Sequence, residues 1–355
     1  MMRTQFFLTR GKPYAVAAGA GIAAGVLFSL THQATFLATA LAYLSPLPIM
    51  IAMLGFGRTA GIGAAIAASV TVFALAIAQM RHGPWTRGVD EAGLAALIFA
   101  LSLGLPALWL SFLAALSRIK GNAPWTISSA AARSFAREYF PLERILTYAV
   151  AISATIAVAA AIYVTFRHGP LEAVIERAVK EVTPVLERIV GENPSLPAGI
   201  HLHAIARLIV LAAAPAMAAS SLVMLMANLW LAGRVAEVSG RLPRPWPDIA
   251  RELQLPRMYA LVFATAVGAS FLGALPGLIS AIVAAALGMG FALQGLAVMH
   301  DLSRGARIRT PLLIAIYFAI ILLMPWPLIL LTLIGLIEAA FSLRQRKAKA
   351  AASKL

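Results

Sequence analysis

Residues 145–166 read ILTYAVAISATIAVAAAIYVTF and contain no charged side chain. A helix needs about 20 predominantly apolar residues to cross a hydrocarbon layer about 30 Å thick. This stretch is long enough, and Arg144 and Arg167 bound it at its two ends. Such a segment is typical of a transmembrane helix, and we expect the rest of the chain to be built from segments like it.

The composition of the whole chain supports the same fold class. Of its 355 residues, 61% are hydrophobic and only 12% are charged, and the mean hydropathy is +0.86. A soluble domain carries about 25% charged residues, so this chain lacks the surface of an ordinary globular protein. The chain also has no cysteine, which excludes disulfides and thiolate metal or nucleophile sites.

Nine further apolar stretches extend the pattern. We predict an all-α, polytopic transmembrane helical bundle of about ten spans. The spans are 13–31, 35–56, 59–79, 92–116, 145–166, 204–232, 258–275, 277–299, 310–324 and 326–343. The first resembles a signal peptide because Arg3, Arg10 and Lys12 precede it, but no small-x-small cleavage site follows, so we expect an uncleaved helix.

The last four spans allow a second count. The segment 310–324 would be only about 22 Å long at 1.5 Å per residue, which is short for a crossing. Pro325-Trp326-Pro327 and the Gly273–Gly277 break both predict tight hairpins. The alternative to ten spans is therefore eight or nine, in which one helix of a hairpin is re-entrant or is shielded from lipid by its neighbours.

Basic side chains alternate with the predicted spans and so predict the orientation. Most of the 29 Lys and Arg residues fall at the two termini and in the loops near 58, 117–144, 233–257 and 300–309. Because Lys and Arg concentrate in cytoplasmic loops, we expect both termini inside, in a bacterial inner membrane. The basic residues behind the net charge of +15 then serve to orient the chain in the membrane, and no nucleic-acid partner is expected.

We expect a single transmembrane domain over 1–343 and a basic cytoplasmic tail over 344–355. The tail and the inner loops are suited to anionic headgroups, so the lipid bilayer is the expected partner. In the loop 117–144, an amphipathic stretch around Phe135, Tyr139 and Phe140 predicts an interfacial helix. In the loop 233–257, a short helix is expected after Asp248.

The longest predicted outer loop contains an amphipathic helix over 170–190. Its apolar positions recur at helical spacing, with Pro184 expected to kink it. The apolar positions are Leu171, Val174, Ile175, Ala178, Val182, Val185, Leu186 and Ile189. The helix either lies on the outer interface or over the bundle, or acts as a lid on a cavity that opens to the outside.

Signatures of catalysis are missing from the chain. It contains no Gly-x-Ser-x-Gly elbow, no His-Glu-x-x-His and no Walker-type phosphate loop, so we predict that it is not an enzyme. His201 and His203 lack carboxylate or further histidine ligands nearby, so no metal or other cofactor is expected. Glu338, in the last span, either reaches the interface or pairs with Arg344.

Four polar residues are the candidates for a binding site. Asn228 and Gln294 are predicted at similar depth in different spans, and Arg207 follows His203 by one turn at the outer end of its span. Asn228 and Gln294 either hydrogen-bond each other as structural links between helices or line a cavity for a small polar solute.

Small residues predict close helix packing. Gly21 and Gly25, Ala20 and Ala24, and Ala64 and Ala68 each have small-xxx-small spacing. This spacing lets helix backbones approach closely, either within the chain or against another protein.

The chain resembles the YybS-like family of bacterial multi-pass membrane proteins. The resemblance rests on Gly290-Phe-Ala-Leu-Gln-Gly-Leu-Ala-Val-Met-His300, and more loosely on Ser45-Pro-Leu-Pro-Ile-Met50 and Asn228-Leu-Trp-Leu-Ala-Gly-Arg234. That family is distantly similar to the S components of energy-coupling factor transporters. These are helical bundles that bind a small solute and dock through small-residue faces on a membrane coupling subunit. The resemblance implies that Ala20, Ala24, Ala64 and Ala68 form a docking face.

Two functions from different classes follow. The first is a small-solute-binding or transport subunit, with the 170–190 helix gating an outward cavity. The second is a structural membrane protein of the cell envelope, which scaffolds partners through its basic loops and small-residue faces and transports nothing.

Overall fold

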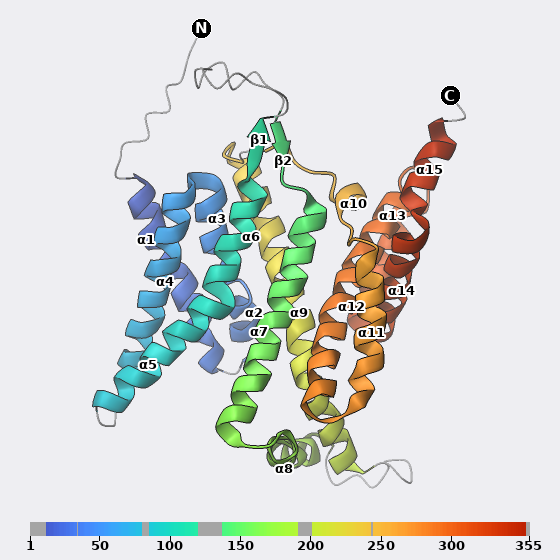
Figure 1. Ribbon diagram of the computed structural model, residues 1–355. Helices are drawn as coiled ribbons and strands as arrows, with labels where there is room; N and C mark the ends of the chain where they lie inside the picture. Colours follow the sequence, from blue (N-terminus) through green and yellow to red (C-terminus); the bar gives the residue numbers. More distant parts are fainter. Residues whose placement is uncertain are drawn as a thin grey trace. The chain divides into compact units, whose positions relative to one another are not determined.

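The computed structural model describes residues 12–33, 35–79, 85–119, 137–190, 201–242 and 244–352, and these are almost entirely helical (Figure 1). The all-α prediction is therefore confirmed. The longer helices are α1 (Lys12–Ser29), α2 (Phe36–Ala42), α3 (Pro46–Phe56), α4 (Arg58–Gln79), α5 (Trp85–Phe99), α6 (Leu105–Ala115), α7 (Leu142–His168), α8 (Leu171–Val190), α9 (Leu202–Val238), α11 (Met258–Ala269), α12 (Ala274–Leu302), α13 (Arg309–Leu322), α14 (Trp326–Phe341) and α15 (Leu343–Ala352). Short elements are α10 (Ile249–Glu252), the 3-10 turns Leu30–Gln33 and Ser270–Leu272, the π turn Ala100–Gly104, and the strands β1 (Ser117–Ile119) and β2 (Arg137–Tyr139).

Each of the ten predicted apolar segments is helical. Six helical segments in the described chain are long and apolar enough to cross a membrane: Phe36–Phe56, Arg58–Gln79, Gly88–Ala115, Leu142–His168, Leu202–Val238 and Ala274–Leu302. The other four predicted spans correspond to shorter apolar helices: Pro13–Ser29, Met258–Leu272, Arg309–Leu322 and Trp326–Phe341. The total of ten spans therefore stays a prediction.

Local chemistry explains where the helices break. Pro46 and Pro48 have no amide hydrogen to continue the helix from α2 into α3, so the segment predicted as one helix over 35–56 consists of two. Gly273 has φ +72 and turns the chain between α11 and α12. Pro276 then lies within the first turn of α12, where a missing amide costs nothing, so this helix begins earlier than predicted.

The interfacial helix predicted around Tyr139 is wrong. Residues 137–139 instead form β2, which pairs antiparallel with β1, and Tyr139 faces Ser117 in the register. Phe135 lies outside the described residues. A helical period and a strand are both compatible with this amphipathic stretch, because alternate positions of a strand also separate polar from apolar side chains. The short helix expected after Asp248 is present as α10.

The chain falls into two compact units. Unit 1 comprises residues 1–145 and 224–247, and unit 2 comprises residues 146–223 and 248–355. In unit 1, α1 packs closely against α4, because Gly21 leaves no room for a side chain: a Cβ there would lie 2.5 Å from the carbonyl oxygen of Ala64. Phe28 and Phe99 pack edge to face with ring centroids 5.1 Å apart.

In unit 2, α12 and α14 are in similarly close contact. A Cβ on Gly295 would lie 2.0 Å from the carbonyl oxygen of Leu331, and a Cβ on Gly335 would lie 2.0 Å from that of Phe291. Small-residue contacts of this kind hold apolar helices together where lipid offers no hydrophobic driving force. At one end of this unit α8 is seen end-on while α7 and α12 run along the page, so α8 lies across the bundle axis (Figure 1).

Candidate functional site: the cavity beneath α8

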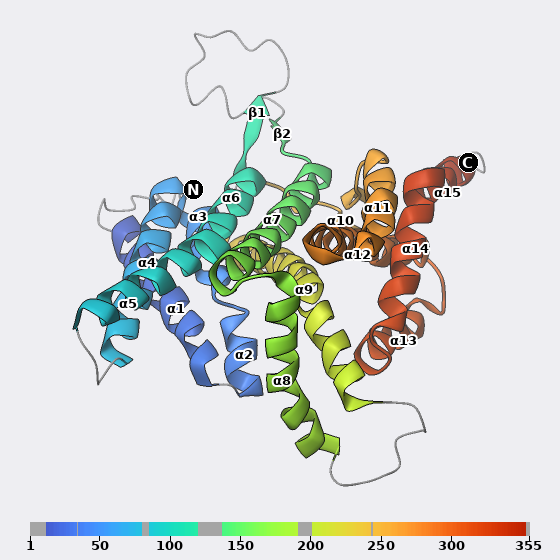
Figure 2. The same ribbon diagram turned by 60° about the horizontal axis from the view of Figure 1, so that its bottom comes forward.

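The amphipathic helix predicted over 170–190 is present as α8, with Pro184 inside it. Gly169 makes the turn from α7 with φ +94, and Pro170 stands directly before the first turn. The first part of the apolar face of α8 is covered, because Ile175 and Val179 are buried with Ala206 of α9, whereas Val185 and Ile189 are exposed. Partly buried side chains from both helices surround this cluster: Leu171, Val182, Leu186 and Val210. Figure 2 shows α8 beside the first turns of α9. The helix is therefore packed on the unit.

A cluster of charges fastens α8 to α9. Arg207 donates from Nη2 to Glu172 at 2.6 Å and from Nη1 to Glu176. Glu172 and Glu176 are one turn apart on α8, so a single guanidinium can reach both. His203 Nε2 lies 3.8 Å from Glu176. The structure thus brings together two of the predicted site residues, Arg207 and His203, and adds two carboxylates, Glu172 and Glu176, that were not predicted as site residues.

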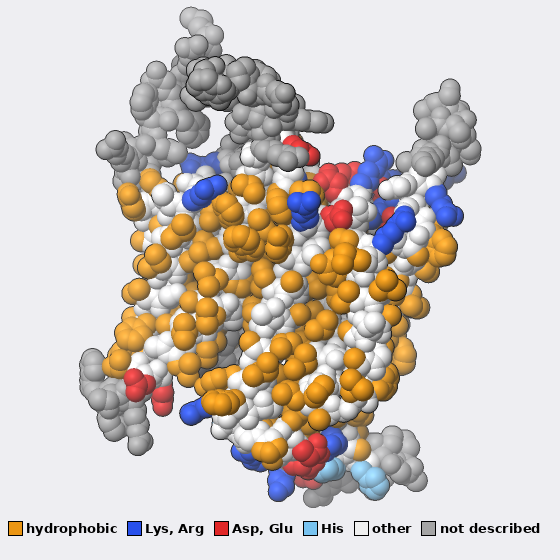
Figure 3. Space-filling model, viewed as in Figure 1, with side chains coloured by type: hydrophobic (Ala, Val, Ile, Leu, Met, Phe, Trp, Pro, Cys, Tyr) orange, Lys and Arg blue, Asp and Glu red, His pale blue; other side chains and the backbone are white. Residues whose placement is uncertain are grey.

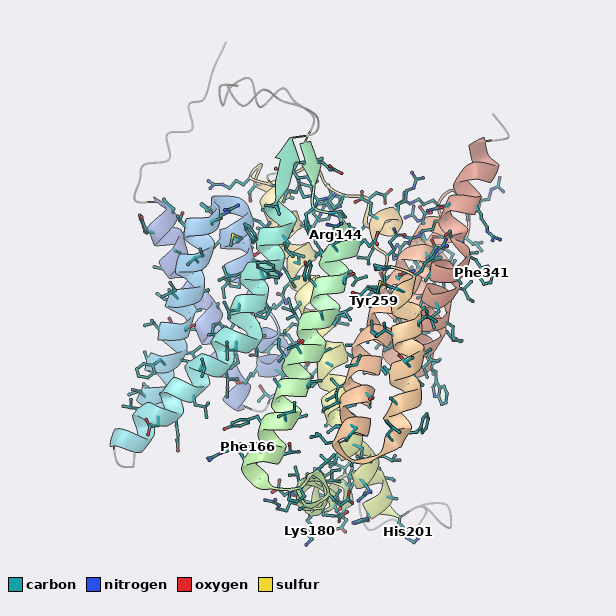
Figure 4. The ribbon with its side chains drawn as sticks, in the orientation of Figure 1. Arg144, Phe166, Lys180, His201, Tyr259 and Phe341 are labelled. Carbon is teal, nitrogen blue, oxygen red and sulfur yellow. The ribbon has the colours of Figure 1, made fainter. Side chains whose placement is uncertain are left out.

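A cavity of about 1150 Å³ opens beside this cluster. Its walls come from the end of α7, the start of α8, α9 and the α11–α12 turn. They are formed by Ile162, Thr165, Phe166, Gly169, Pro170, Leu171, Glu172, Ile175, Arg207, Leu211, Ser270, Phe271, Gly273, Ala274, Leu275, Gly277, Leu278 and Ala281. Figure 4 labels Phe166 at the end of α7 and Lys180 on α8, at the same end of unit 2.

The cavity is largely apolar, and its charges lie at one level. Among the described residues, Arg207 and Glu172 are its only ionisable lining residues, with Thr165 and Ser270 as uncharged polar neighbours. Figure 3 shows acidic, basic and histidine side chains gathered over α8 and the start of α9, and a hydrophobic surface along the helices of the same unit. The lining offers no nucleophile with an adjacent base, and no described residues form a group of three or more potential metal ligands of the His, Cys, Asp or Glu type. This arrangement is suited to binding an amphipathic molecule.

Gln294 does not line the cavity. Its side chain is 1% exposed and fully engaged: Oε1 accepts from the amide of Leu255 at 2.6 Å, and Nε2 donates to the carbonyl of Gly335 at 3.0 Å. Gln294 therefore joins α12 to α14 and to the segment before α11. Gln294 links helices, but the predicted hydrogen bond to Asn228 is wrong, because both of its partners are backbone groups.

Asn228 belongs to unit 1 and is not among the residues that line the cavity. Its Nδ2 donates to the carbonyls of Tyr43 and Met224, each at 2.8 Å. The Tyr43 carbonyl lies in the break between α2 and α3, where the amide of Leu47 bonds to Leu44 instead. Asn228 therefore satisfies a carbonyl freed by the helix break, as buried backbone at membrane depth requires. Its Oδ1 is buried without a partner among the described residues.

The small residues of α1 and α4 lie mostly inside unit 1. Ala24, Ala64 and Ala68 are fully buried and Ala20 is half-buried. Close packing within the chain, one of the two predicted uses of this spacing, is what the structure shows. Docking of a partner through these four residues stays a prediction, and the covered side chains do not support it.

A second polar cluster, at the ends of α12 and α14, was missed from the sequence. Arg304 Nη1 donates to Asp248 at 2.7 Å, and its Nη2 bonds the other carboxylate oxygen. This bidentate pair lowers the pKa of Asp248 and raises that of Arg304. The nearly buried Asp301 lies 3.3 Å from Arg251. The cluster consists of two local pairs, Asp248 with Arg251 and Asp301 with Arg304, and no local pattern reveals that they meet, because they are separated by about 50 positions.

The same cluster holds the start of the C-terminal tail. Glu338 and Arg344 form a buried ion pair at 2.9 Å, which confirms one of the two roles predicted for Glu338. Arg344 Nη1 also donates to the carbonyls of Ala250 and Arg251 at 2.8 and 3.0 Å. Arg344 thus belongs to the packed structure, and α10 is tied to the end of α14 through it.

Comparison with known proteins yields no relative: no family model, no curated protein and no solved structure matches this chain. The function has to be inferred from the site itself.

Proposed function

We propose that the chain is a multi-pass protein of the bacterial inner membrane that binds a small amphipathic molecule in the cavity beneath α8. The single observation that supports this is the joint occurrence of an apolar cavity of about 1150 Å³ and a charged mouth formed by Arg207 and Glu172. Ligand sites typically combine an apolar lining with a few polar groups that fix orientation.

The amphipathic helix favours binding over a purely structural role. In this proposal α8 covers one side of the site, as the lid interpretation of the sequence requires, and the charge distribution of the loops supports an outer position for it. A scaffold would present an uncovered small-residue face, whereas Ala24, Ala64 and Ala68 are buried within unit 1. A transport role would add to this binding function a membrane coupling subunit that drives release of the bound molecule.

A cavity-filling substitution tests the proposal. Ala281 lines the cavity on α12, so Ala281→Trp would occupy the space of the ligand. Ala264 is exposed on α11 and does not line the cavity, so Ala264→Trp is the matched control. The purified full-length proteins are compared by native mass spectrometry for molecules that remain bound after extraction.

We expect the wild type and Ala264→Trp to retain the same bound molecule and Ala281→Trp to lose it. Equal retention by all three proteins, with comparable thermal unfolding profiles, would contradict the proposed function.

A further inference from the structure

The position of the polar groups along the cavity points to the kind of ligand. Arg207 lies about 7.5 Å along the helix axis from Leu202, the first residue of α9. Thr165 lies about 4.5 Å from His168, the last residue of α7. Ala281 lies about 10 Å beyond Ala274, the first residue of α12. The polar lining residues therefore all lie near helix ends, and the lining residues further along the helices are apolar.

This gradient matches the boundary between headgroups and acyl chains. A half-open, apolar cavity on an apolar helical unit is poorly suited to water, which would find few polar partners there. A bilayer lipid is the amphipathic molecule present at the highest concentration around such a surface. Its acyl chain would replace water against Leu211 and Leu278, with its headgroup at the level of Arg207.

The charges at the mouth restrict the headgroup further. Arg207 offers five N–H donors in a planar fork, and two of them go to Glu172 and Glu176. A phosphate oxygen is a suitable acceptor for the remaining donors. Glu172 is 65% exposed, so its carboxylate can meet a cation at the same level. An anionic headgroup would instead face two carboxylates beside the Arg207 guanidinium, since the nearby Arg177 donates to the carbonyl of His168.

We propose that the cavity beneath α8 binds a zwitterionic phospholipid, with its phosphate on Arg207, its ammonium group on Glu172 and Glu176, and an acyl chain along the apolar wall. This assignment rests on the proposed function and names the class of its ligand. The binding involves no covalent step. In this proposal, side chains of α8 and α9 bind the lipid headgroup.

The test uses delipidated full-length protein titrated with phosphatidylethanolamine or phosphatidylglycerol of identical acyl chains, with bound lipid counted by native mass spectrometry. We expect one site with an affinity about fivefold higher for phosphatidylethanolamine, the size of effect that one partly exposed ion pair supplies. Replacing both carboxylates, Glu172→Gln with Glu176→Gln, should abolish or reverse the preference. Glu187→Gln, an exposed carboxylate of α8 outside the cavity, is the control.

The outcomes separate the two proposals. If Ala281→Trp loses a bound molecule that is not a phospholipid, the lipid assignment is overturned and the proposed function stands. If both lipids bind equally and the Gln variants change nothing, the headgroup assignment is overturned. If Ala281→Trp carries as many lipids as the wild type, the bound lipids are annular, and both proposals are overturned.

Discussion

Arg207 on α9 bonds Glu172 on α8 at 2.6 Å, across 35 positions of sequence. This pair, with Glu176, is the polar part of the attachment of α8, and Ile175, Val179 and Ala206 are its apolar part. Because the ionic side chains are 36 to 65% exposed, their contribution to global stability is small. Their effect is expected to be local and to concern how tightly α8 is held over the cavity.

Arg207→Met should therefore loosen α8 without unfolding unit 2. We expect faster amide hydrogen exchange over 171–190 and a free energy of unfolding within about 1 kcal/mol of the wild type. Arg188→Met is the control, since Arg188 bonds only the carbonyl of Pro184 in its own helix among the described residues. Unchanged exchange in α8 of the Arg207 variant would show that the apolar contacts alone hold the helix.

Gln294→Leu and Asn228→Leu should differ in cost, although both remove a buried amide side chain. The first leaves the buried amide of Leu255 without its acceptor, and an orphaned buried donor costs about 1–3 kcal/mol. The second frees the carbonyl of Tyr43 but also removes the unpartnered Oδ1 of Asn228, so its net cost should be smaller. Thermal unfolding in detergent measures both, and an equal or larger loss for Asn228→Leu would refute the account of Gln294.

The contact between α12 and α14 predicts a sharp difference between two glycines. Gly335→Ala would place a Cβ 2.0 Å from the carbonyl oxygen of Phe291, so the helices must separate, and we expect a loss of about 3 kcal/mol or more. Gly268→Ala on α11 meets no atom within 4 Å and should be neutral or stabilise its helix by up to about 1 kcal/mol. Thermal unfolding of the two variants makes the comparison. Equal stability of the two would contradict the close contact.

The Asp248–Arg304 pair predicts a pH dependence. The hydrogen bond from Arg304 holds the pKa of Asp248 below its ordinary value of 3.8. The pair's contribution to stability is therefore fully present above about pH 4 and is lost as the pH falls through the lower, folded-state pKa. The difference in unfolding temperature between the wild type and Asp248→Asn should be largest near neutral pH and should shrink below pH 4. A difference that grows on acidification would contradict this sign.

Much of the fold could be predicted because long apolar runs leave little choice of secondary structure. The helix over 145–166 and the amphipathic helix over 170–190 follow from composition and period alone. The roles of Gln294 and Arg207 did not follow in the same way. Their partners, Leu255 and Glu172, lie tens of residues away in the sequence. Only the packing of the helices shows that Gln294 is a structural link between helices, whereas Arg207 lines a cavity.

An experimental structure of the full-length chain in native-lipid nanodiscs tests the central claim most directly. The account predicts elongated non-protein density in the cavity of unit 2, running from the guanidinium of Arg207 along Leu211 toward Ala281. A cavity that is closed by α8 against α12, or that holds only ordered water, would contradict it.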